Sequence, residues 1–585
     1  MKALKHLNKY FYKYRYRLII GVIITIIAKI FMLFTPRLIG ASINVVSDRL
    51  DGKITLEVFK VELLTNVCYI IGAAIIAGIF TFLMRQTIIN VSRYIEYDLK
   101  NEIYKHYQVL SLNFYKSNRT GDLMNRISED VGKVRMYVGP ALMYTMNTLT
   151  LFTVAIIYMT STAPKLTLYT LLPLPFLSVA IYKLSRMINK RSTIVQQSLS
   201  TLSTYSQETF SGISVIKSYG IEPRTNTEFQ SLSAENRQKQ INLTKVQALF
   251  FPLMILLIGV SNLIVIYIGG LQYMSGEIEK IGTIAEFIIY VNMLTWPVAT
   301  VGWVTSLVQQ AEASQERINE FLNTEPDIKN TAKTLTPIKG DIEFKNVSFV
   351  YPDTNIEALK DVSFTLKSGK TLAILGKTGS GKSTILDLIG RLYDVDNGSI
   401  LVDDTIISEL HLNSLRESIG YVPQDAFLFS DTIENNIKFG KEDATKNEVI
   451  EAAKNAKVHK NIIGFSKGYD TILGERGITL SGGQKQRVSI ARAIIKKPDI
   501  LLFDDCLSAV DTETEEKILK NLVKLTKDKT TIIVSHRVSS AKNADHIIVL
   551  DDGKIIQTGS HESLINTDGY YKELYTKQLS EKEKY

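Results

Sequence analysis

Residues 374–384, ILGKTGSGKST, place glycines, a lysine and a serine at a spacing that suits the phosphates of a nucleoside triphosphate. Glycines let backbone N–H groups approach phosphate oxygens, and a helix N-terminus favours anions. The apolar run TLAIL precedes this loop and the helical run ILDLIGRLY follows it, which is the strand–loop–helix setting of a P-loop. The residues expected to bind the nucleotide here are Gly376, Lys377, Thr378, Gly379, Ser380, Gly381, Lys382, Ser383 and Thr384.

Two further motifs follow the P-loop in a fixed order. Residues 480–494, LSGGQKQRVSIARAI, put a Ser-Gly-Gly turn before a helix, and by itself such a turn can be a simple cap. The run KPDILLFDD then ends an apolar strand on Asp504 and Asp505. A carboxylate at that strand end can hold Mg²⁺ through water. The order of the three motifs is far more specific than any one of them.

The N-terminal half reads as a membrane domain. Hydrophobic residues make up 45% of the 585-residue chain, and most of the long apolar runs fall before residue 310. A bilayer core of about 30 Å needs about 20 apolar residues per helix. The expected spans lie near 18–40, 61–84, 138–160, 166–184, 247–273 and 283–308. The expected domains are a membrane domain at 1–323, a linker at 324–340 and a nucleotide-binding domain at 341–585.

The net charge of +9 is explained mostly by membrane topology. Lys and Arg gather in the N-terminal arm and in the segments after the second and fourth spans, which predicts that these are cytoplasmic. Nucleic-acid binding is unnecessary to explain the charge. The breaks at 112–127 and 218–229 lie at the tips of long cytoplasmic loops and could dock on a soluble domain, against the alternative of plain surface loops. Two cysteines indicate no disulfide framework.

One charge lies inside the first expected span. Lys29 is about 18 Å along the helix from Arg17. A charge at that depth faces a cavity or a partner, or its long side chain reaches back toward water. Glu286, near the start of the sixth span, is a candidate partner.

In their order along the chain, the motifs resemble those of ATP-binding cassette (ABC) transporters. The six spans fused ahead of one nucleotide domain resemble a bacterial exporter half-transporter, of the kind that carries drugs or lipids. The resemblance implies a multidomain fold: an all-α six-helix transmembrane domain followed by an α/β P-loop NTPase domain. It implies ATP with Mg²⁺ as the cofactor.

The resemblance also assigns roles to residues outside the P-loop. Tyr351, in VSFVYP, matches the aromatic that stacks on adenine, against the alternative of a core or edge-strand tyrosine. Gln424, in YVPQDAFLF, matches the glutamine that senses Mg²⁺, and His536, in IIVSHR, matches the switch histidine. Asp511, in SAVD, matches a loop that crosses the dimer interface, and Asp505 stands at the position of the catalytic base.

Three groups of residues complete the implied site. The Mg²⁺ ligands would be Ser383, Gln424 and Asp504. LGERG, at 473–477, matches a motif that lies near the cytoplasmic loop tips of exporters. The signature residues, which would bind the ATP held by the other subunit, are Leu480, Ser481, Gly482, Gly483 and Gln484.

The single nucleotide domain implies a dimer with two ATP sites. The family pattern has Glu where this chain has Asp505, so we expect slow but measurable hydrolysis. Asp at this position also marks the impaired site of heterodimeric exporters. Because Lys382, Gln424, the LSGGQ motif and His536 are all present, we favour a homodimer with attenuated hydrolysis and keep a heterodimer with a related half-transporter as the alternative.

An ATP-driven exporter of a drug, lipid or peptide in the inner (plasma) membrane is the expected function. The N-terminus and the nucleotide-binding domain would be cytoplasmic. A low-turnover ATP-binding regulatory subunit is the alternative from another class. Import is a minor alternative, because importers of this family usually keep membrane and ATPase chains separate. A soluble ATPase acting on DNA or ribosomes is excluded by the apolar spans.

Overall fold

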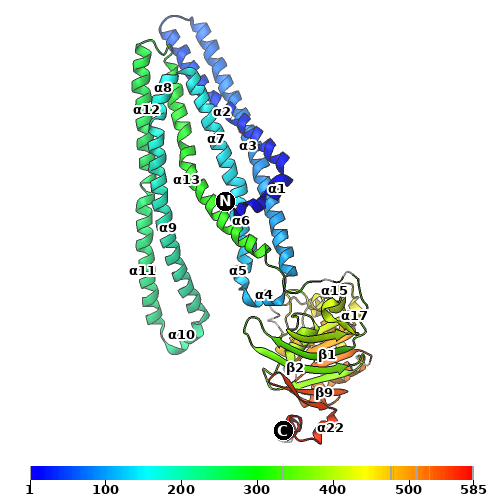
Figure 1. The fold of residues 1–585 in the computed structure, drawn as a ribbon. Helices are drawn as coiled ribbons and strands as arrows, with labels where there is room; N and C mark the ends of the chain where they lie inside the picture. The colour runs from blue at the N-terminus through cyan, green and yellow to red at the C-terminus, as the bar shows by residue number, and fades with distance from the viewer. Residues whose placement is uncertain are drawn as a thin grey trace. The chain divides into compact units, whose positions relative to one another are not determined.

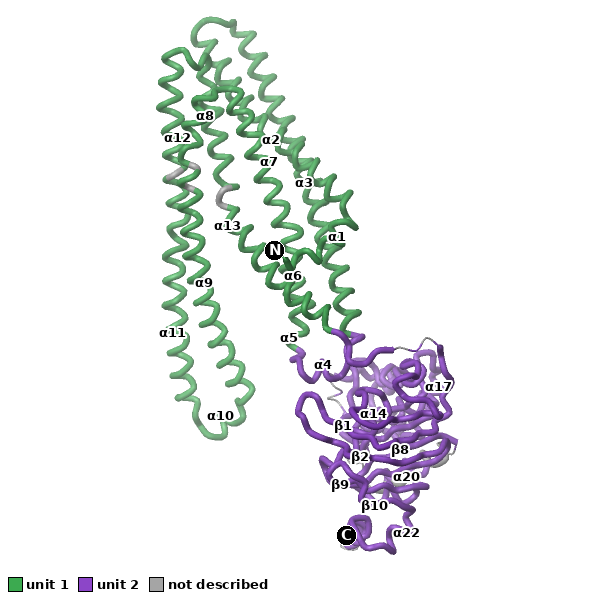
Figure 2. Tube along the Cα trace, viewed as in Figure 1, with its two compact units in different colours: residues 1–107, 121–324 green, residues 108–120, 325–585 purple. Residues whose placement is uncertain are grey.

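The computed structural model describes residues 2–330, 332, 334–474, 477, 480–506, 512–525 and 528–582. The chain divides into two compact units, which are shown in separate colours in Figure 2. The first unit is helical and comprises Met1–Tyr107 and Gly121–Thr324. The second comprises Gln108–Thr120 and Glu325–Tyr585 and contains every described strand. The segment Gln108–Thr120 lies within the predicted membrane domain but packs with the second unit.

The first unit is built from long helices (Figure 1). Its short N-terminal elements are the 3₁₀ turn Ala3–Leu7 and α1 (Asn8–Lys13). The π-helical segments Arg126–Asp130 and Tyr137–Ala141 interrupt the helical run that precedes α7. The other helices are α2 (Arg15–Leu50), α3 (Leu56–Val109), α5 (Thr120–Asn125), α6 (Val131–Met136), α7 (Leu142–Thr162), α8 (Pro164–Leu171), α9 (Pro173–Ser211), α10 (Ile213–Tyr219), α11 (Glu222–Gln247), α12 (Phe250–Met274) and α13 (Gly282–Leu322).

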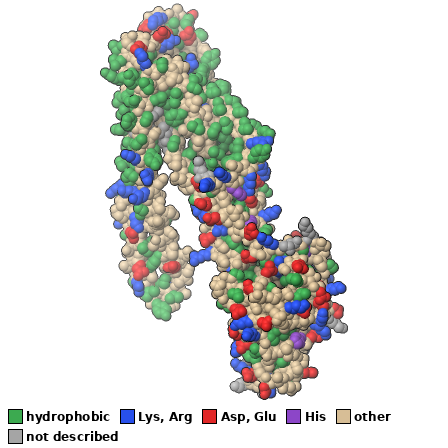
Figure 3. Space-filling view, viewed as in Figure 1, with side chains coloured by type: hydrophobic (Ala, Val, Ile, Leu, Met, Phe, Trp, Pro, Cys, Tyr) green, Lys and Arg blue, Asp and Glu red, His purple; other side chains and the backbone are tan. Residues whose placement is uncertain are grey.

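Among the described residues, five helical stretches are long and apolar enough to cross a membrane. They are Arg15–Leu50, Leu56–Val109, Thr120–Thr162, Glu222–Met274 and Gly282–Leu322. The predicted span near 166–184 falls on α8 and the first part of α9 and stays a prediction. Large apolar side chains are exposed on α2, α3 and α12, and Figure 3 shows them covering much of one face of this unit. Such a surface is expected to face lipid.

Glycine allows α2 and α13 to approach each other closely. A Cβ on Gly282 would lie 2.0 Å from the carbonyl oxygen of Gly40, so only glycine fits there. The backbone N–H of Gly282 donates a hydrogen bond to Asn44 Oδ1 at 2.8 Å. This pairing of small residues is typical of helices that associate within a membrane.

The second unit contains two sheets. The antiparallel sheet has the order β2–β1–β4–β5, and the mainly parallel sheet has the order β10–β9–β3–β8–β7–β6. The strands are β1 (Ile342–Val350), β2 (Glu357–Leu366), β3 (Thr371–Gly376), β4 (Asn397–Val402), β5 (Thr405–Ile406), β6 (Ile419–Val422), β7 (Ile500–Asp504), β8 (Thr530–Val534), β9 (His546–Asp551) and β10 (Lys554–Gly559). The helices are α4 (Leu112–Ser117), α14 (Lys382–Ile389), α15 (Leu412–Ser418), α16 (Ile433–Lys438), α17 (Lys446–Asn455), α18 (His459–Ile463), α19 (Gly482–Ile495), α20 (Thr512–Leu525), α21 (Val538–Ala541), α22 (His561–Ile565) and α23 (Tyr570–Lys582).

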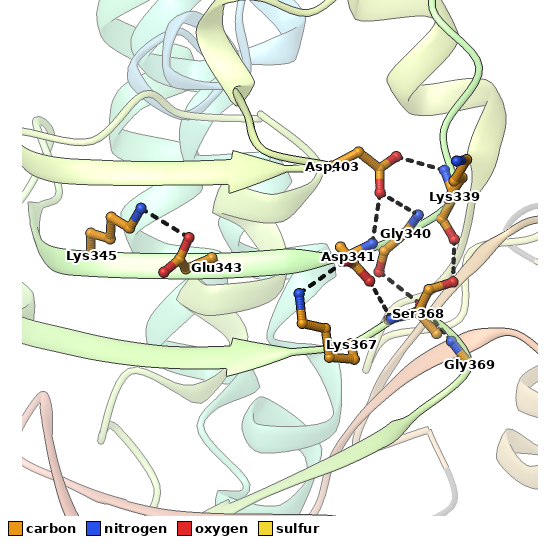
Figure 4. Close-up of polar contacts among 10 residues, drawn as sticks. Lys339, Gly340, Asp341, Glu343, Lys345, Lys367, Ser368, Gly369 and Asp403 are labelled. Carbon is orange, nitrogen blue, oxygen red and sulfur yellow. Dashed lines mark hydrogen bonds and ion pairs between the residues drawn. The ribbon is translucent and has the colours of Figure 1, made fainter.

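Two aspartates fasten the start of β1 (Figure 4). The carboxylate of Asp403, in the turn between β4 and β5, accepts hydrogen bonds from the backbone N–H groups of Lys339, Gly340 and Asp341 at 2.6–3.0 Å. Asp341 in turn accepts a bond from the Nζ of Lys367 at 3.1 Å. One carboxylate thus accepts hydrogen bonds from three backbone N–H groups directly before β1, which holds the start of β1 in a fixed register beside β4.

Candidate functional site

The parallel strands gather the predicted catalytic motifs at one sheet edge. β3 pairs with β8, and β8 pairs with β7, all in the same direction. The carboxyl ends of parallel strands open on one edge, where ligands of α/β sheets bind. The P-loop follows β3, Asp504 ends β7, and His536 follows β8. The sheet order therefore brings together three motifs that are far apart in the sequence.

The P-loop backbone has the conformation that close phosphate contact requires. Gly376 and Gly381 have φ values of 151° and 97°, and a Cβ at these positions would lie 2.1 Å and 2.3 Å from carbonyl oxygens of neighbouring strands. The Nζ of Lys382 donates hydrogen bonds to the carbonyl oxygens of Gly376 (3.0 Å) and Lys377 (2.7 Å), so its ammonium is held within the loop. The buried Oγ of Ser380 has no hydrogen-bond partner among the described residues. A donor of this kind in a glycine cradle fits a phosphate oxygen.

Two of the predicted Mg²⁺ ligands are adjacent. The Ser383 hydroxyl donates a hydrogen bond to Asp504 Oδ1 at 2.8 Å. Burial raises the pKa of the Asp504 carboxyl, and the neighbouring Asp505 raises it further, whereas the bond from Ser383 lowers it. A carboxylate and a hydroxyl are the hard oxygen ligands that Mg²⁺ prefers, so the donor set suits this cation beside phosphates. Gln424 follows the end of β6, the strand next to β7, and its side chain is exposed.

Asp505 occupies a constrained backbone position. Its φ is +41°, in the left-handed region, and its backbone N–H donates to the carbonyl of Val534 at 2.9 Å. The next residue, Cys506, is buried, and burial raises the pKa of its thiol. The thiol is therefore protonated and unreactive, as expected for a packing residue. The fixed backbone limits how far the short Asp505 carboxylate can reach.

His536 has a lowered imidazole pKa and a hydrogen-bonded backbone carbonyl. Burial lowers the pKa of its imidazole, and the nearby ammonium of Lys382 lowers it further, so the ring is neutral at pH 7. Its backbone carbonyl accepts a hydrogen bond from the Gln578 side chain at 3.0 Å. Gln578 also accepts a bond from the N–H of Val538 at 2.9 Å. This contribution from α23 could not be predicted from the sequence, because a glutamine on a polar C-terminal helix belongs to no motif.

The predicted adenine-stacking residue lies beside the P-loop helix. The hydroxyls of Tyr351 and Thr384 are 3.0 Å apart and hydrogen-bonded. The Nζ of Lys116, in α4, lies 4.7 Å from the ring centroid of Tyr351 and 5.1 Å from that of Tyr393. The two rings meet edge to face at 5.5 Å. Neither Lys116 nor Tyr393 was predicted, since no sequence pattern links a loop lysine to a tyrosine more than 230 residues away.

The signature residues begin α19. Ser481 is its N-cap, and with Gln484 it forms a capping box: the Ser481 N–H donates to Gln484 Oε1 at 3.0 Å and the Gln484 N–H to Ser481 Oγ at 3.4 Å. The capping interpretation of this turn is therefore correct as local structure. Ser481 and Gly482 are exposed, and Leu480 is buried. An exposed helix N-terminus suits an anion presented by another molecule.

Some predicted positions lie outside the described residues. These are Asp511 and the central Glu475 and Arg476 of the LGERG segment. The expected pairing of Lys29 with Glu286 is not formed. Lys29 Nζ lies 3.7 Å from Met32 Sδ, whereas the buried Glu286 accepts a hydrogen bond from the Tyr290 hydroxyl at 2.9 Å. The hydrogen-bond partner of that carboxyl is thus a hydroxyl one helical turn away on the same helix, and not Lys29.

The chain is similar to known proteins along its whole length. Residues 18–298 match the ABC transporter transmembrane region, and residues 359–508 match the ABC transporter family. The probable multidrug resistance ABC transporter ATP-binding/permease protein YheI of Bacillus subtilis (strain 168) is 36% identical over 580 residues, 98% of this chain and 97% of that protein. The multidrug resistance-like ATP-binding protein MdlA of Escherichia coli (strain K12) is 33% identical over 584 residues, 99% and 97% of the two chains. A solved structure of a bacterial Atm1-family ABC exporter with ATP bound superimposes with a TM-score of 0.79 at 27% identity, covering 96% of this chain and 98% of that one.

Proposed function

The chain belongs to the ABC transporter family, and on this premise we propose that it is the subunit of an ATP-driven exporter of hydrophobic or amphipathic molecules. The predicted family and fold class are confirmed by these matches. The relatives named as multidrug resistance proteins support the proposed type of cargo. The exporter would lie in the plasma membrane, with the N-terminus and the nucleotide-binding domain in the cytoplasm.

One observation carries the proposal. Ser383 and Asp504, which come from separate motifs, are hydrogen-bonded at the mouth of a glycine cradle, in a chain that also has helices able to cross a membrane. We propose that Ser383, Asp504 and Gln424 hold Mg²⁺ with ATP, that Lys382 binds the phosphates, and that Tyr351 stacks on adenine. Mg²⁺ would neutralise charge that develops on the transferred phosphoryl group.

Hydrolysis requires water to be positioned beside the γ-phosphate. We propose that Asp505 polarises this water and that His536, as a neutral imidazole, holds the γ-phosphate. Both residues lie near Lys382, whose ammonium stabilises the same developing charge. The signature residues and Asp511 would act across a dimer, each subunit completing the ATP site of the other. Closure of that dimer would drive alternating access of the membrane helices.

A second candidate function rests on Asp505 itself. A carboxylate one methylene shorter than Glu, on a backbone fixed at Val534, suits a low-turnover site in a heterodimeric exporter. ATP hydrolysis by the full-length chain, purified alone and reconstituted in lipid nanodiscs, distinguishes the homodimeric exporter from this low-turnover subunit. Vanadate-sensitive ATP hydrolysis by this chain alone supports the homodimeric exporter. Hydrolysis that appears only after a related half-transporter is added supports the regulatory subunit.

A further inference from the structure

The membrane unit has a large, partly open cavity between α7, α9 and α13. Its volume is about 1190 Å³, above the roughly 300–1,000 Å³ typical of small-molecule sites. Phe152, Ile181 and Val301 give it apolar walls. The wall between α9 and α13 is tight at one point, because a Cβ on Gly302 would lie 2.7 Å from Ser185 Oγ. The cavity thus has room for a whole amphipathic molecule and apolar surface to hold part of it.

The charge in this cavity has one sign. Lys183, Arg186 and Lys190 line it, and no Asp or Glu is among its lining residues. The spacing i, i+3, i+7 puts all three on one face of α9. None of them has an ion-pair partner among the described residues. A second cavity of about 460 Å³ is lined by Lys190, Arg191 and Lys239, so basic side chains of both α9 and α11 lie here, although Lys239 is paired with Glu235 at 2.6 Å. Figure 3 shows Lys and Arg side chains on this part of the two helices.

Topology alone does not account for this arrangement. The positive-inside rule asks for Lys and Arg at the cytoplasmic ends of the spans, but it does not ask that they share a face or line a cavity. Other cations of the same unit are paired with acids: Lys9 with Glu102 and Lys13 with Asp98. Lys183, Arg186 and Lys190 have no such acidic partner among the described residues, and the three of them share one cavity.

The apolar and basic parts of the cavity follow one another along α9. From Ile181 to Lys190 the helix rises by about 14 Å, roughly the length of a short acyl chain. Ile181 lies within the predicted span at 166–184, and Arg186 and Lys190 lie just beyond it. An amphipathic molecule entering from the inner leaflet would meet apolar walls in the bilayer and cations at the headgroup level.

We propose that the cargo of this transporter is an amphipathic organic anion, whose carboxylate, sulfonate or phosphate binds Lys183, Arg186 and Lys190 while its apolar part packs against Phe152, Ile181 and Val301. The proposal rests on the proposed export function and adds the chemical class of its substrate. Amphipathic cations are the disfavoured class, because three unpaired positive charges repel them.

The test measures ATP-dependent transport by the full chain in inside-out proteoliposomes, with uptake divided by the ATP hydrolysed in the same vesicles. Four fluorescent probes are compared: phosphatidylglycerol and phosphatidylcholine with the same labelled chain, and the carboxylate and quaternary-ammonium derivatives of one soluble fluorophore. The lipid pair tests whether the anion belongs to a lipid headgroup, and the soluble pair tests whether it belongs to a free organic acid. The variants are K183Q, R186Q, K190Q and their triple combination. The matched control is K245Q, an exposed lysine of α11 that lines neither cavity.

We expect the anionic member of at least one pair to be transported at least 5-fold faster than its partner. The triple variant should raise the KM for that anion by about 10-fold and each single variant by about 2–5-fold, while K245Q changes it less than 2-fold. Retained transport of the zwitterionic or cationic probe by the triple variant shows that this variant is folded. A preference for the cationic or zwitterionic probe, an equal effect of K245Q, or vanadate-sensitive hydrolysis without transport of either anion overturns the substrate class. Absence of ATP hydrolysis by the parent chain alone instead contradicts the homodimeric exporter on which this proposal rests.

Discussion

The side chain of Gln578 donates a hydrogen bond to the backbone carbonyl of His536 at 3.0 Å and accepts one from the N–H of Val538 at 2.9 Å. The C-terminal helix thus holds the backbone directly after the proposed switch histidine. Since a shift of about 1 Å at a catalytic group can cost about 100-fold in rate, this contact is expected to matter for turnover.

The first prediction concerns this contact. Q578A should lower kcat for ATP hydrolysis by about 10-fold, with a change of less than 2-fold in ATP affinity, because Gln578 is not part of the P-loop. Q578E keeps the acceptor for the Val538 N–H and removes the donor to the His536 carbonyl. Its kcat should therefore lie between that of the parent and that of Q578A. K577A, an exposed neighbour on α23, is the control. A loss of ATP affinity as large as the loss of kcat would mean that α23 acts on folding instead.

The second prediction concerns the length of the catalytic carboxylate. Asp505 is held at φ +41° by its bond to Val534, so the backbone cannot readily move to extend its reach. D505E should raise the ATPase rate by about 10-fold or more, and D505N should lower it to background. Steady-state kinetics of the reconstituted chain measure both. An unchanged rate in D505E would show that Asp505 does not limit turnover.

The third prediction concerns Lys116. Its ammonium lies 4.7 Å from the ring centroid of Tyr351, against the surface on which adenine is proposed to stack. K116M keeps the length of the side chain and removes the charge. It should tighten ATP binding by about 2–5-fold, since a partly exposed cation–π contact contributes about 0.5–1 kcal/mol. Fluorescent-nucleotide titration measures the change, with Y351A expected to weaken binding. Weaker binding in K116M would show that Lys116 supports the nucleotide.

The fourth prediction concerns pH. Burial raises the pKa of Asp387, on α14, from 3.8 to about 6, against an opposing effect of Lys116. The folded protein therefore binds this proton more tightly than the unfolded chain, so stability falls as pH rises from about 4 to about 6 and stays lower above that range. D387N removes the effect. The difference in Tm between D387N and the parent should be about 2–6 °C larger at pH 7.5 than at pH 5, both measured on nucleotide-free protein. A pH-independent difference would contradict this assignment.

The fold and the motif positions could be predicted because local patterns encode them. Apolar runs of membrane length, the glycine spacing around Lys382 and the acid-ended strand at Asp504 each depend on neighbours in the sequence. The parallel order of β3, β8 and β7 then brings these motifs to one edge.

The remaining features depend on contacts between distant residues, which no local pattern encodes. Lys116 and Tyr351, Gln578 and His536, and the shared face of Lys183 and its neighbours become visible only when helices are placed. The Lys29–Glu286 pairing was wrong for the same reason. A nearby hydroxyl on Tyr290 satisfies the carboxyl, and opposite charge in the sequence did not show this.

The most direct test of the central claim is ATP-dependent uptake of an amphipathic fluorescent probe into inside-out proteoliposomes that contain the full chain. Lys382, held within the P-loop by the carbonyls of Gly376 and Lys377, is the residue to remove. We predict uptake that requires hydrolysable ATP, is blocked by vanadate and falls to the level of empty liposomes in K382A. Uptake that is equal in K382A, or equal with and without ATP, would contradict the assignment of this chain as an ATP-driven exporter.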